Sequence, residues 1–347
     1  MSHGHLSFKT KKITMKNFLF IIAVVAIIAI FEACSASAFE TIVPYDVPFE
    51  KTRLVVNAEL SGSKDTFVAY LSKSRTTSEA ITEAFDTLAK ANISLYQNGT
   101  KYRDLTFVEK KTALDNNGNS QNLYKYIAIV DKNLPLTKYS LKASAVGYDD
   151  ISADDVLNQG VAINNLSFKI DGFESFTTSL NGKTKTIQDL VEFDINDPTA
   201  DNFYIIQISY KRTNNQGDSI LRLSNFTMNQ QFTASNTGYS GNKALIPDLT
   251  FAGKNLKVQI GVTPPRSGGK GGGPGGGGGG QTTERPKYYD IIVKSVSRNA
   301  YQFENSLAAY NANNGNPFAE PTVLYTNVYK GYGLFSAVNV TTKRIYL

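Results

Sequence analysis

An acidic loop in the second half of the chain carries the side chains best suited to hold a metal ion. Asp194, Asn196, Asp197 and Asp201 bring oxygen-bearing side chains into one short stretch, and Ca²⁺ prefers carboxylate and amide oxygens. Their spacing differs from that of the EF-hand loop, which has a central glycine and a closing glutamate. The alternative is a structural turn that begins at Asp197 and Pro198.

Aromatic residues near the C-terminus are the candidates for contact with a partner. Tyr329 and Tyr332 lie in a dense aromatic and polar segment, and tyrosine offers a large contact area at a low cost in conformational entropy. Gly331 and Gly333 allow a tight turn or a close backbone approach. The alternative is that this segment is an interlocking strand and turn with a structural role only.

The sequence offers few groups for catalysis. His3 and His5 are the only histidines, Cys34 is the only cysteine, and tryptophan is absent. If these first residues are removed or serve as an anchor, the mature chain has no imidazole and no free thiol. This excludes Ser-His-Asp and Cys-His triads and ordinary zinc sites. We therefore expect no enzymatic activity and no cofactor.

Residues 1–33 are predicted to be a secretory signal peptide. A basic start at Met15 is followed by 13 uninterrupted apolar residues, 18–30. This length fits the apolar region of a signal peptide and falls short of the roughly 20 residues of a membrane-spanning helix. Translation from Met1 or from Met15 remains open.

Cys34 is the predicted lipid anchor. It follows Ala33 just after the apolar run, in a segment that resembles a bacterial lipobox. Residues 34–50 would then form the anchor and a linker. The alternative is cleavage by ordinary signal peptidase after residues 36–38, an Ala-Ser-Ala site.

The charge balance gives little support for nucleic-acid binding. The chain has 36 basic and 30 acidic residues, a formal net charge of +6. Loss of residues 1–33, with four lysines and one glutamate, leaves +3. No dense run of Lys and Arg survives in the mature chain, so we expect no nucleic-acid partner.

The elements that must position these residues are predicted to be almost all β-strands. Short β-branched or alternating runs are separated by turns, which indicates an all-β fold of two immunoglobulin-like β-sandwich domains. The first domain covers residues 51–155 and the second covers residues 156–347. Asn98-Gly99 predicts a hairpin turn.

One helix is expected in the C-terminal region. Ser297 would cap its N-terminus. Helical spacing places four residues on its apolar face: Ala300, Phe303, Leu307 and Tyr310. Residues 268–280, with eleven glycines, predict a flexible insert that interrupts a hairpin between strands ending near Val262 and beginning near Tyr288.

Several of these segments resemble a family of Bacteroidetes outer-membrane lipoproteins of unassigned biochemistry, whose genes often accompany TonB-dependent receptors. The matching segments are 54–56, 194–198 before Phe203-Tyr204, 316–321, 327–328 and 331–335. The resemblance implies a lipid anchor in the outer membrane, at the cell surface, and a TonB-dependent receptor as partner.

The size and basic charge are also similar to those of the small hemagglutinins B and C of Porphyromonas, a resemblance that implies attachment to a host-cell protein or glycan. The leading hypothesis is an envelope-anchored adhesin that also contacts the membrane through its N-terminal lipid. The alternatives are an accessory lipoprotein of a TonB-dependent receptor and a structural subunit of a surface assembly.

Overall fold

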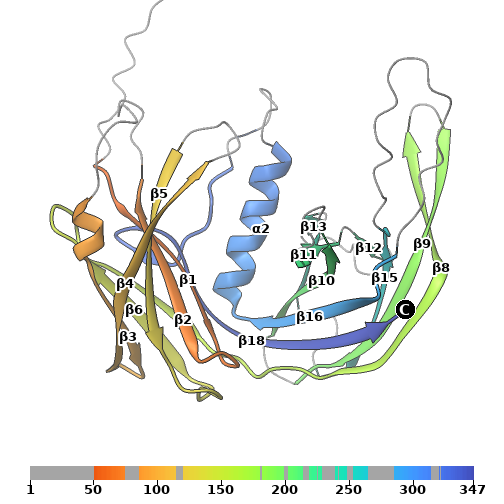
Figure 1. Cartoon of the computed structure of the whole chain (residues 1–347), viewed down its shortest axis with the longest axis horizontal. Helices are drawn as coiled ribbons and strands as arrows, with labels where there is room; N and C mark the ends of the chain where they lie inside the picture. The colour runs from red at the N-terminus through yellow and green to blue at the C-terminus, as the bar shows by residue number, and fades with distance from the viewer. Residues whose placement is uncertain are drawn as a thin grey trace, which may run out of the picture. The chain divides into compact units, whose positions relative to one another are not determined.

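In the computed structural model of the chain (Figure 1), β-strands make up most of the described residues between Lys51 and Leu347. The structure describes residues 51–74, 86–114, 120–179, 182–198, 202–213, 219–224, 226–228, 239–240, 242–247, 253–264, 285–313, 320 and 322–347. The predicted signal peptide, Cys34, Asp201 and the glycine-rich segment 268–280 lie outside these residues. No helix in the described part is long and apolar enough to cross a bilayer.

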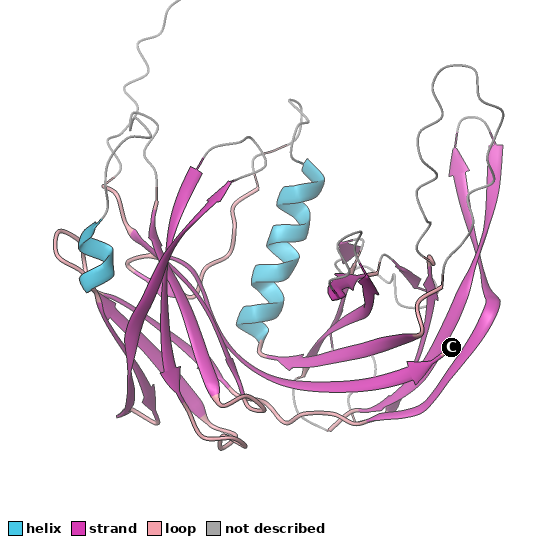
Figure 2. Cartoon of the chain, in the orientation of Figure 1, coloured by secondary structure: helices cyan, strands magenta, loops and turns pink. Residues whose placement is uncertain are grey.

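The fold is all-β, as predicted, with one α-helix among the described residues, α2 (Arg298–Asn313) (Figure 2). A short 3₁₀ helix, η2, covers Asp86–Lys90. The strands of the larger sheet are β1 (Leu54–Ser61), β2 (Thr66–Lys73), β3 (Asn92–Gln97), β4 (Thr100–Leu114), β5 (Ser120–Ile129), β6 (Lys138–Ser144), β7 (Ile151–Val156), β10 (Phe203–Thr213), β11 (Ser219–Leu223), β13 (Tyr239–Ser240), β14 (Lys243–Pro247), β16 (Tyr288–Val296), β17 (Val328–Tyr329) and β18 (Tyr332–Tyr346). The smaller sheet contains β8 (Ile163–Ser179), β9 (Gly182–Asn196), β12 (Phe226–Met228) and β15 (Asn255–Val262).

Strand β18 joins the early and late parts of the larger sheet. Its first half, 332–338, pairs in parallel with β1, and its second half, 339–346, pairs antiparallel with β16. The sheet order is therefore β13-β14-β10-β16-β18-β1-β2-β5-β4-β3-β6-β7-β17, with β11 beside β10.

Two main apolar clusters fill the interior. The first contains side chains of residues 54–157 together with Val328, Phe335 and Ala337 from the C-terminal segment. The second lies between the smaller sheet and strands β10 and β16 of the larger one, and Val191, Val258 and Tyr289 in it are fully buried. The predicted boundary at residues 155 and 156 falls at the end of β7, and the division into two domains stays a prediction.

Helix α2 begins as predicted. The Ala300 amide donates to the Ser297 hydroxyl over 3.2 Å, which satisfies one of the free N–H groups of the first turn. The predicted apolar face is only partly right: Ala300 and Tyr301 are the buried residues of the helix, and Tyr310 is 43% exposed.

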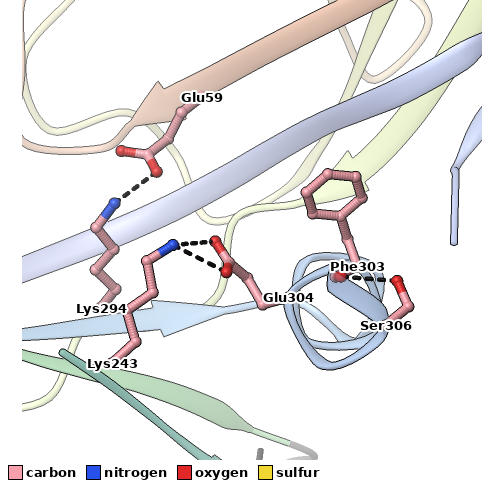
Figure 3. Close-up of polar contacts among 6 residues, drawn as sticks. All are labelled: Glu59, Lys243, Lys294, Phe303, Glu304 and Ser306. Carbon is pink, nitrogen blue, oxygen red and sulfur yellow. Dashed lines mark hydrogen bonds and ion pairs between the residues drawn. The ribbon is translucent and has the colours of Figure 1, made fainter. Parts of the chain in front are cut away.

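One ion pair holds the helix to the sheet, and another joins two strands of the sheet (Figure 3). The Lys243 ammonium on β14 lies 2.8 and 2.9 Å from the two carboxylate oxygens of Glu304 on α2. Lys294 on β16 reaches across β18 to Glu59 on β1 over 2.6 Å. The helix is thus tied by charge as well as by its small apolar face.

The two predicted hairpins have different outcomes. Asn98 and Gly99 have φ of 48° and 80° and join β3 to β4, so that hairpin is confirmed. The prediction of a hairpin between Val262 and Tyr288 is wrong. Strand β15 pairs with β9 in the smaller sheet, whereas β16 pairs with β10 and β18 in the larger one. Each strand finds its neighbour far away in sequence, so closeness along the chain was misleading.

Candidate binding surface

The acidic loop uses its most buried carboxylate for the fold. Asp197 is 8% exposed. One carboxylate oxygen accepts from the Tyr204 hydroxyl, and the other accepts from the Gly253 amide over 2.9 Å. This carboxylate therefore ties the end of β9 to β10 and to the turn before β15.

Two of the other predicted calcium ligands lie on the outward face of β9. Asp194 accepts from the Asn165 amide over 2.6 Å, and Asn196 is exposed at the end of β9. Asp201 lies outside the described residues. Within the described part of the chain, no three His, Cys, Asp or Glu side chains gather in a metal-binding group. The calcium hypothesis stays a prediction.

The Gly-x-Gly pair at the start of β18 permits a close approach to β1. A Cβ atom on Gly331 would lie 2.7 Å from the Leu54 carbonyl oxygen, and one on Gly333 would lie 2.0 Å from that of Val56. Gly333 also has φ of +105°, which side-chain-bearing residues rarely adopt. Both glycines are thus required by the parallel pairing of β1 and β18.

Tyr332 is partly buried beside this pairing. It lies opposite Val55 in the β1–β18 register, and the Arg53 guanidinium lies 5.3 Å from the centre of its ring. A cation over an aromatic face is attractive, so this contact holds Tyr332 near the first residues of the fold.

Tyr329 is the exposed member of the predicted pair. It lies opposite Ser152 in the pairing of β17 with β7, and 67% of its surface is accessible. The Lys330 ammonium lies 5.4 Å from the ring centre. A short strand at the sheet edge therefore presents an aromatic ring in a fixed position.

Basic groups surround Asp149 near these tyrosines. The Lys51 ammonium lies 3.0 Å from the Asp149 carboxylate. The pKa of Asp149 is lowered, first by the hydrogen bond and charge of Lys51 and further by the charges of Lys330 and Arg53. The surface that carries Tyr329 and Tyr332 is thus aromatic and basic.

Outward-facing side chains continue this surface along β7. Ser152, Asp154 and Val156 alternate with buried neighbours. Their register partners on β6 are Lys142, Ser140 and Lys138. The Lys142 ammonium also lies 4.6 Å from the centre of the Tyr96 ring, which extends the aromatic and basic character to β3.

A pocket of about 470 Å³ lies where this row reaches the N-terminus of α2. Its lining comes from β6, β7, the start of β10 and the first turn of α2. The lining residues are Lys138, Asp154, Asp155, Val156, Asn158, Phe203, Ser297, Arg298 and Asn299. The volume lies within the range of small-molecule sites, about 300–1,000 Å³.

Asp155 is the buried carboxylate of this pocket. It is 2% exposed, and its oxygens accept from the Ala337 amide over 2.7 Å and from the Asn299 side chain over 3.3 Å. Burial raises the pKa of the Asp155 carboxyl, opposed by hydrogen bonds that include those from Ser297 and Ala337. One side chain therefore connects β7, β18 and the start of α2.

The pKa of the adjacent Asp154 shifts in the opposite direction. Partial burial acts to raise it, but hydrogen bonds from Lys138 and Ser140 outweigh burial and leave it lowered. The Lys138 ammonium lies 2.8 Å from the Asp154 carboxylate. The rim of the pocket thus holds a charged pair, and its buried part holds a carboxyl group whose pKa is raised.

The pocket was not predicted, although the sequence carries one signal for it. Ile151, Ala153 and Leu157 are the inward positions of β7 and the residue after it, and Asp155 interrupts this apolar alternation. A charged residue at a core position demands partners. The identity of those partners could not be read from the sequence, because they lie more than 100 residues away.

Comparison with known proteins gives a family and no activity. A family model described as a domain of unknown function (DUF4249) matches residues 40–344. No curated protein matches the chain.

Proposed function

We propose a function for this chain from the premise that it belongs to the DUF4249 family, a domain of unknown function. The protein is a non-enzymatic lipoprotein of the outer membrane, as in the Bacteroidetes family that its motifs resemble. Cys34 carries the lipid, and the folded part binds a protein or glycan on a host cell in the manner of an adhesin or hemagglutinin.

The observation that carries this proposal is the exposure of Tyr329. A tyrosine that is 67% accessible, at the sheet edge and beside Lys330, resembles the anchors that dominate binding interfaces. Tyr332 contributes less contact area because it is partly buried. Binding without turnover is proposed because every histidine and the single cysteine lie within the first 34 residues.

The second candidate is an accessory lipoprotein that contacts a TonB-dependent receptor. It is favoured by the position of the basic residues: Lys51 and Arg53 are the first charged residues after the proposed linker, and both act on Asp149 beside Lys330. A surface close to the point where the chain leaves its anchor suits a partner in the same membrane.

The test uses the native lipoprotein and its Tyr329→Ala variant. The native protein is expected to agglutinate red cells, to adhere to host cells or to co-purify with an outer-membrane receptor. Tyr329→Ala is expected to weaken that binding about tenfold or more, as loss of an interface anchor does, with an unchanged circular dichroism spectrum.

A matched control is Tyr310→Ala, which removes a tyrosine that is 43% exposed on α2. Equal binding by the native protein and Tyr329→Ala would place the contact elsewhere. Absence of agglutination, adhesion and receptor capture by the native protein would reject the binding function itself.

A further inference from the structure

We propose that the pocket between β7 and the N-terminus of α2 binds a neutral saccharide unit. This inference rests on the proposed binding function and names its ligand class. The pocket is separate from Tyr332 and from the acidic loop. It adjoins the outward-facing row of β7 that begins beside Tyr329, so one continuous surface would hold a glycan.

The charges around the pocket favour a neutral ligand. Lys138 and Arg298 contribute two cations to the lining, and Asp154 and Asp155 contribute two carboxyl groups. An anionic ligand would meet Asp154, and a cationic ligand would meet Lys138 and Arg298. Because unfavourable like-charge contacts cost several kcal/mol at an interface, either charge is disfavoured relative to a neutral molecule.

The side chains of the lining suit a molecule with many hydroxyl groups. The Asp154 carboxylate can accept hydrogen bonds, and the Lys138 ammonium and the Arg298 guanidinium can donate them. The Asn158 and Asn299 amides donate within the protein. Val156, 47% exposed, adds an apolar element at the edge. The Phe203 ring also lines the pocket, but it is only 8% exposed, and the Arg298 guanidinium lies 5.6 Å from its centre. A sugar ring has both apolar and polar surfaces, and a lining with few apolar and several polar groups suits both.

The pocket is built on fixed elements. Asn158 donates to the Val296 carbonyl oxygen over 3.0 Å, and Asn299 donates to the Asp154 carbonyl oxygen over 3.3 Å. The Phe203 ring packs against Tyr301 with centres 4.8 Å apart. Groups held in this way lose little conformational freedom on binding, which favours affinity.

The test measures binding of defined saccharides to the purified native lipoprotein in detergent. The neutral probes are lactose, N-acetyllactosamine and α-1,2-mannobiose. The comparison probes are 3′-sialyllactose, glucosamine and tetra-alanine, which represent an anion, a cation and a peptide. Saturation-transfer NMR is expected to detect binding of at least one neutral disaccharide. The comparison probes are expected to bind more weakly or not at all.

Two variants locate the site. Asp154→Asn and Arg298→Gln are each expected to weaken the affinity for that disaccharide about tenfold, the effect of losing one hydrogen bond to a charged group. Glu174→Gln is the matched control, because Glu174 forms an exposed 2.6 Å pair with Lys185 on the β8–β9 hairpin and should bind normally. Asp154→Asn alters a side chain that is 55% exposed, so it tests the site even if Arg298→Gln fails to fold.

Three results would overturn the inference: no signal from any neutral disaccharide, stronger binding of a charged sugar or of tetra-alanine, or equal loss in Glu174→Gln and Asp154→Asn. Cell or receptor binding that depends on Tyr329 while every saccharide fails would leave the proposed function standing and reject only the ligand class. Saccharide binding without any cell or receptor binding would reject the proposed function and leave the ligand class standing.

Discussion

Asp154 and Asp155 are neighbours in sequence with opposite surroundings. Asp154 faces outward to Lys138 and Ser140, and Asp155 faces inward to Ala337 and the first turn of α2. Solvent and a lysine favour the charged form of the first, whereas burial favours the neutral form of the second. The pKa of Asp154 is therefore lowered and that of Asp155 is raised.

We predict that the two carboxyl groups titrate on opposite sides of the ordinary Asp value of 3.8. Because folding raises the pKa of Asp155, its contribution to stability is full below the unfolded pKa and is lost as pH rises through the folded pKa. For Asp154 the contribution is present above the unfolded pKa and is lost as pH falls through the folded one. Carboxyl ¹³C NMR would measure both, and a higher pKa for Asp154 than for Asp155 would contradict the assignment.

A second prediction at this scale concerns Gly333. Alanine there must adopt φ near +105° and place its Cβ 2.0 Å from the Val56 carbonyl oxygen, so β1 and β18 must separate. The control is Gly99→Ala, with φ of +80° and no atom within 4 Å of the added carbon. We expect the control to lose about 1–2 kcal/mol from backbone strain and Gly333→Ala to lose more. Urea unfolding would measure both, and equal losses would show that the close approach is unimportant.

At the scale of elements, the β8–β9 hairpin is fixed near its middle. The Asp189 side chain is fully buried and accepts two hydrogen bonds from Arg285, over 2.8 and 3.0 Å. Gln188 donates to the Gly261 carbonyl oxygen over 3.1 Å. Phe173 packs on Gly261, where a Cβ atom would lie 2.2 Å from its ring.

Removing the guanidinium should therefore be costly. Arg285→Met leaves a buried carboxylate without its cation, and loss of one partner of a buried pair costs about 3–5 kcal/mol. The exposed pair between Lys185 and Glu174 on the same hairpin is the control, since surface pairs contribute about 0–1 kcal/mol. Thermal or urea unfolding of Arg285→Met and Lys185→Met should rank them in this order, and similar stabilities would show that Arg285 does not hold the hairpin.

Local signals in the sequence predicted local structure well. The Asn98-Gly99 turn and the Ser297 cap depend on residues within a few positions, and both are found. The parallel pairing of β1 with β18 and the separation of β15 from β16 depend on partners far along the chain. No periodicity specifies such partners, because alternating strands of similar composition can pair in many orders.

The candidate site also has one part that could be predicted from local sequence and one part that could not. Tyr329 was predicted as a contact residue from its place in an aromatic and polar segment just before Gly331, and the structure shows it exposed. The pocket needs β6, β7, β10 and α2 to meet, so only the folded chain reveals it. Asp155 was visible in the sequence as one of several acidic residues, but its burial depends on Ala337 and Asn299 from distant elements.

At the scale of the whole molecule, attachment to the membrane is predicted to depend on Cys34. Cys34→Ala removes the proposed site of lipid attachment, and several acyl chains anchor a protein far more stably than one. We expect the variant to move from the membrane pellet to the soluble fraction after a carbonate wash. Retention in the pellet would show that the anchor is not this cysteine, and mass spectrometry of the mature N-terminus would identify the cleavage site.

The central claim is that the surface around Tyr329 contacts a partner. A photo-cross-linking residue at position 329, in intact cells that express the native lipoprotein and are mixed with host cells, tests it most directly. The same residue at position 176 is the control, because Phe176 is also half exposed, at 50%, but lies on β8. We predict a discrete cross-linked product, from a host surface molecule or an outer-membrane receptor, at position 329 and none at position 176. No product at 329, or the same products at both positions, would contradict the account.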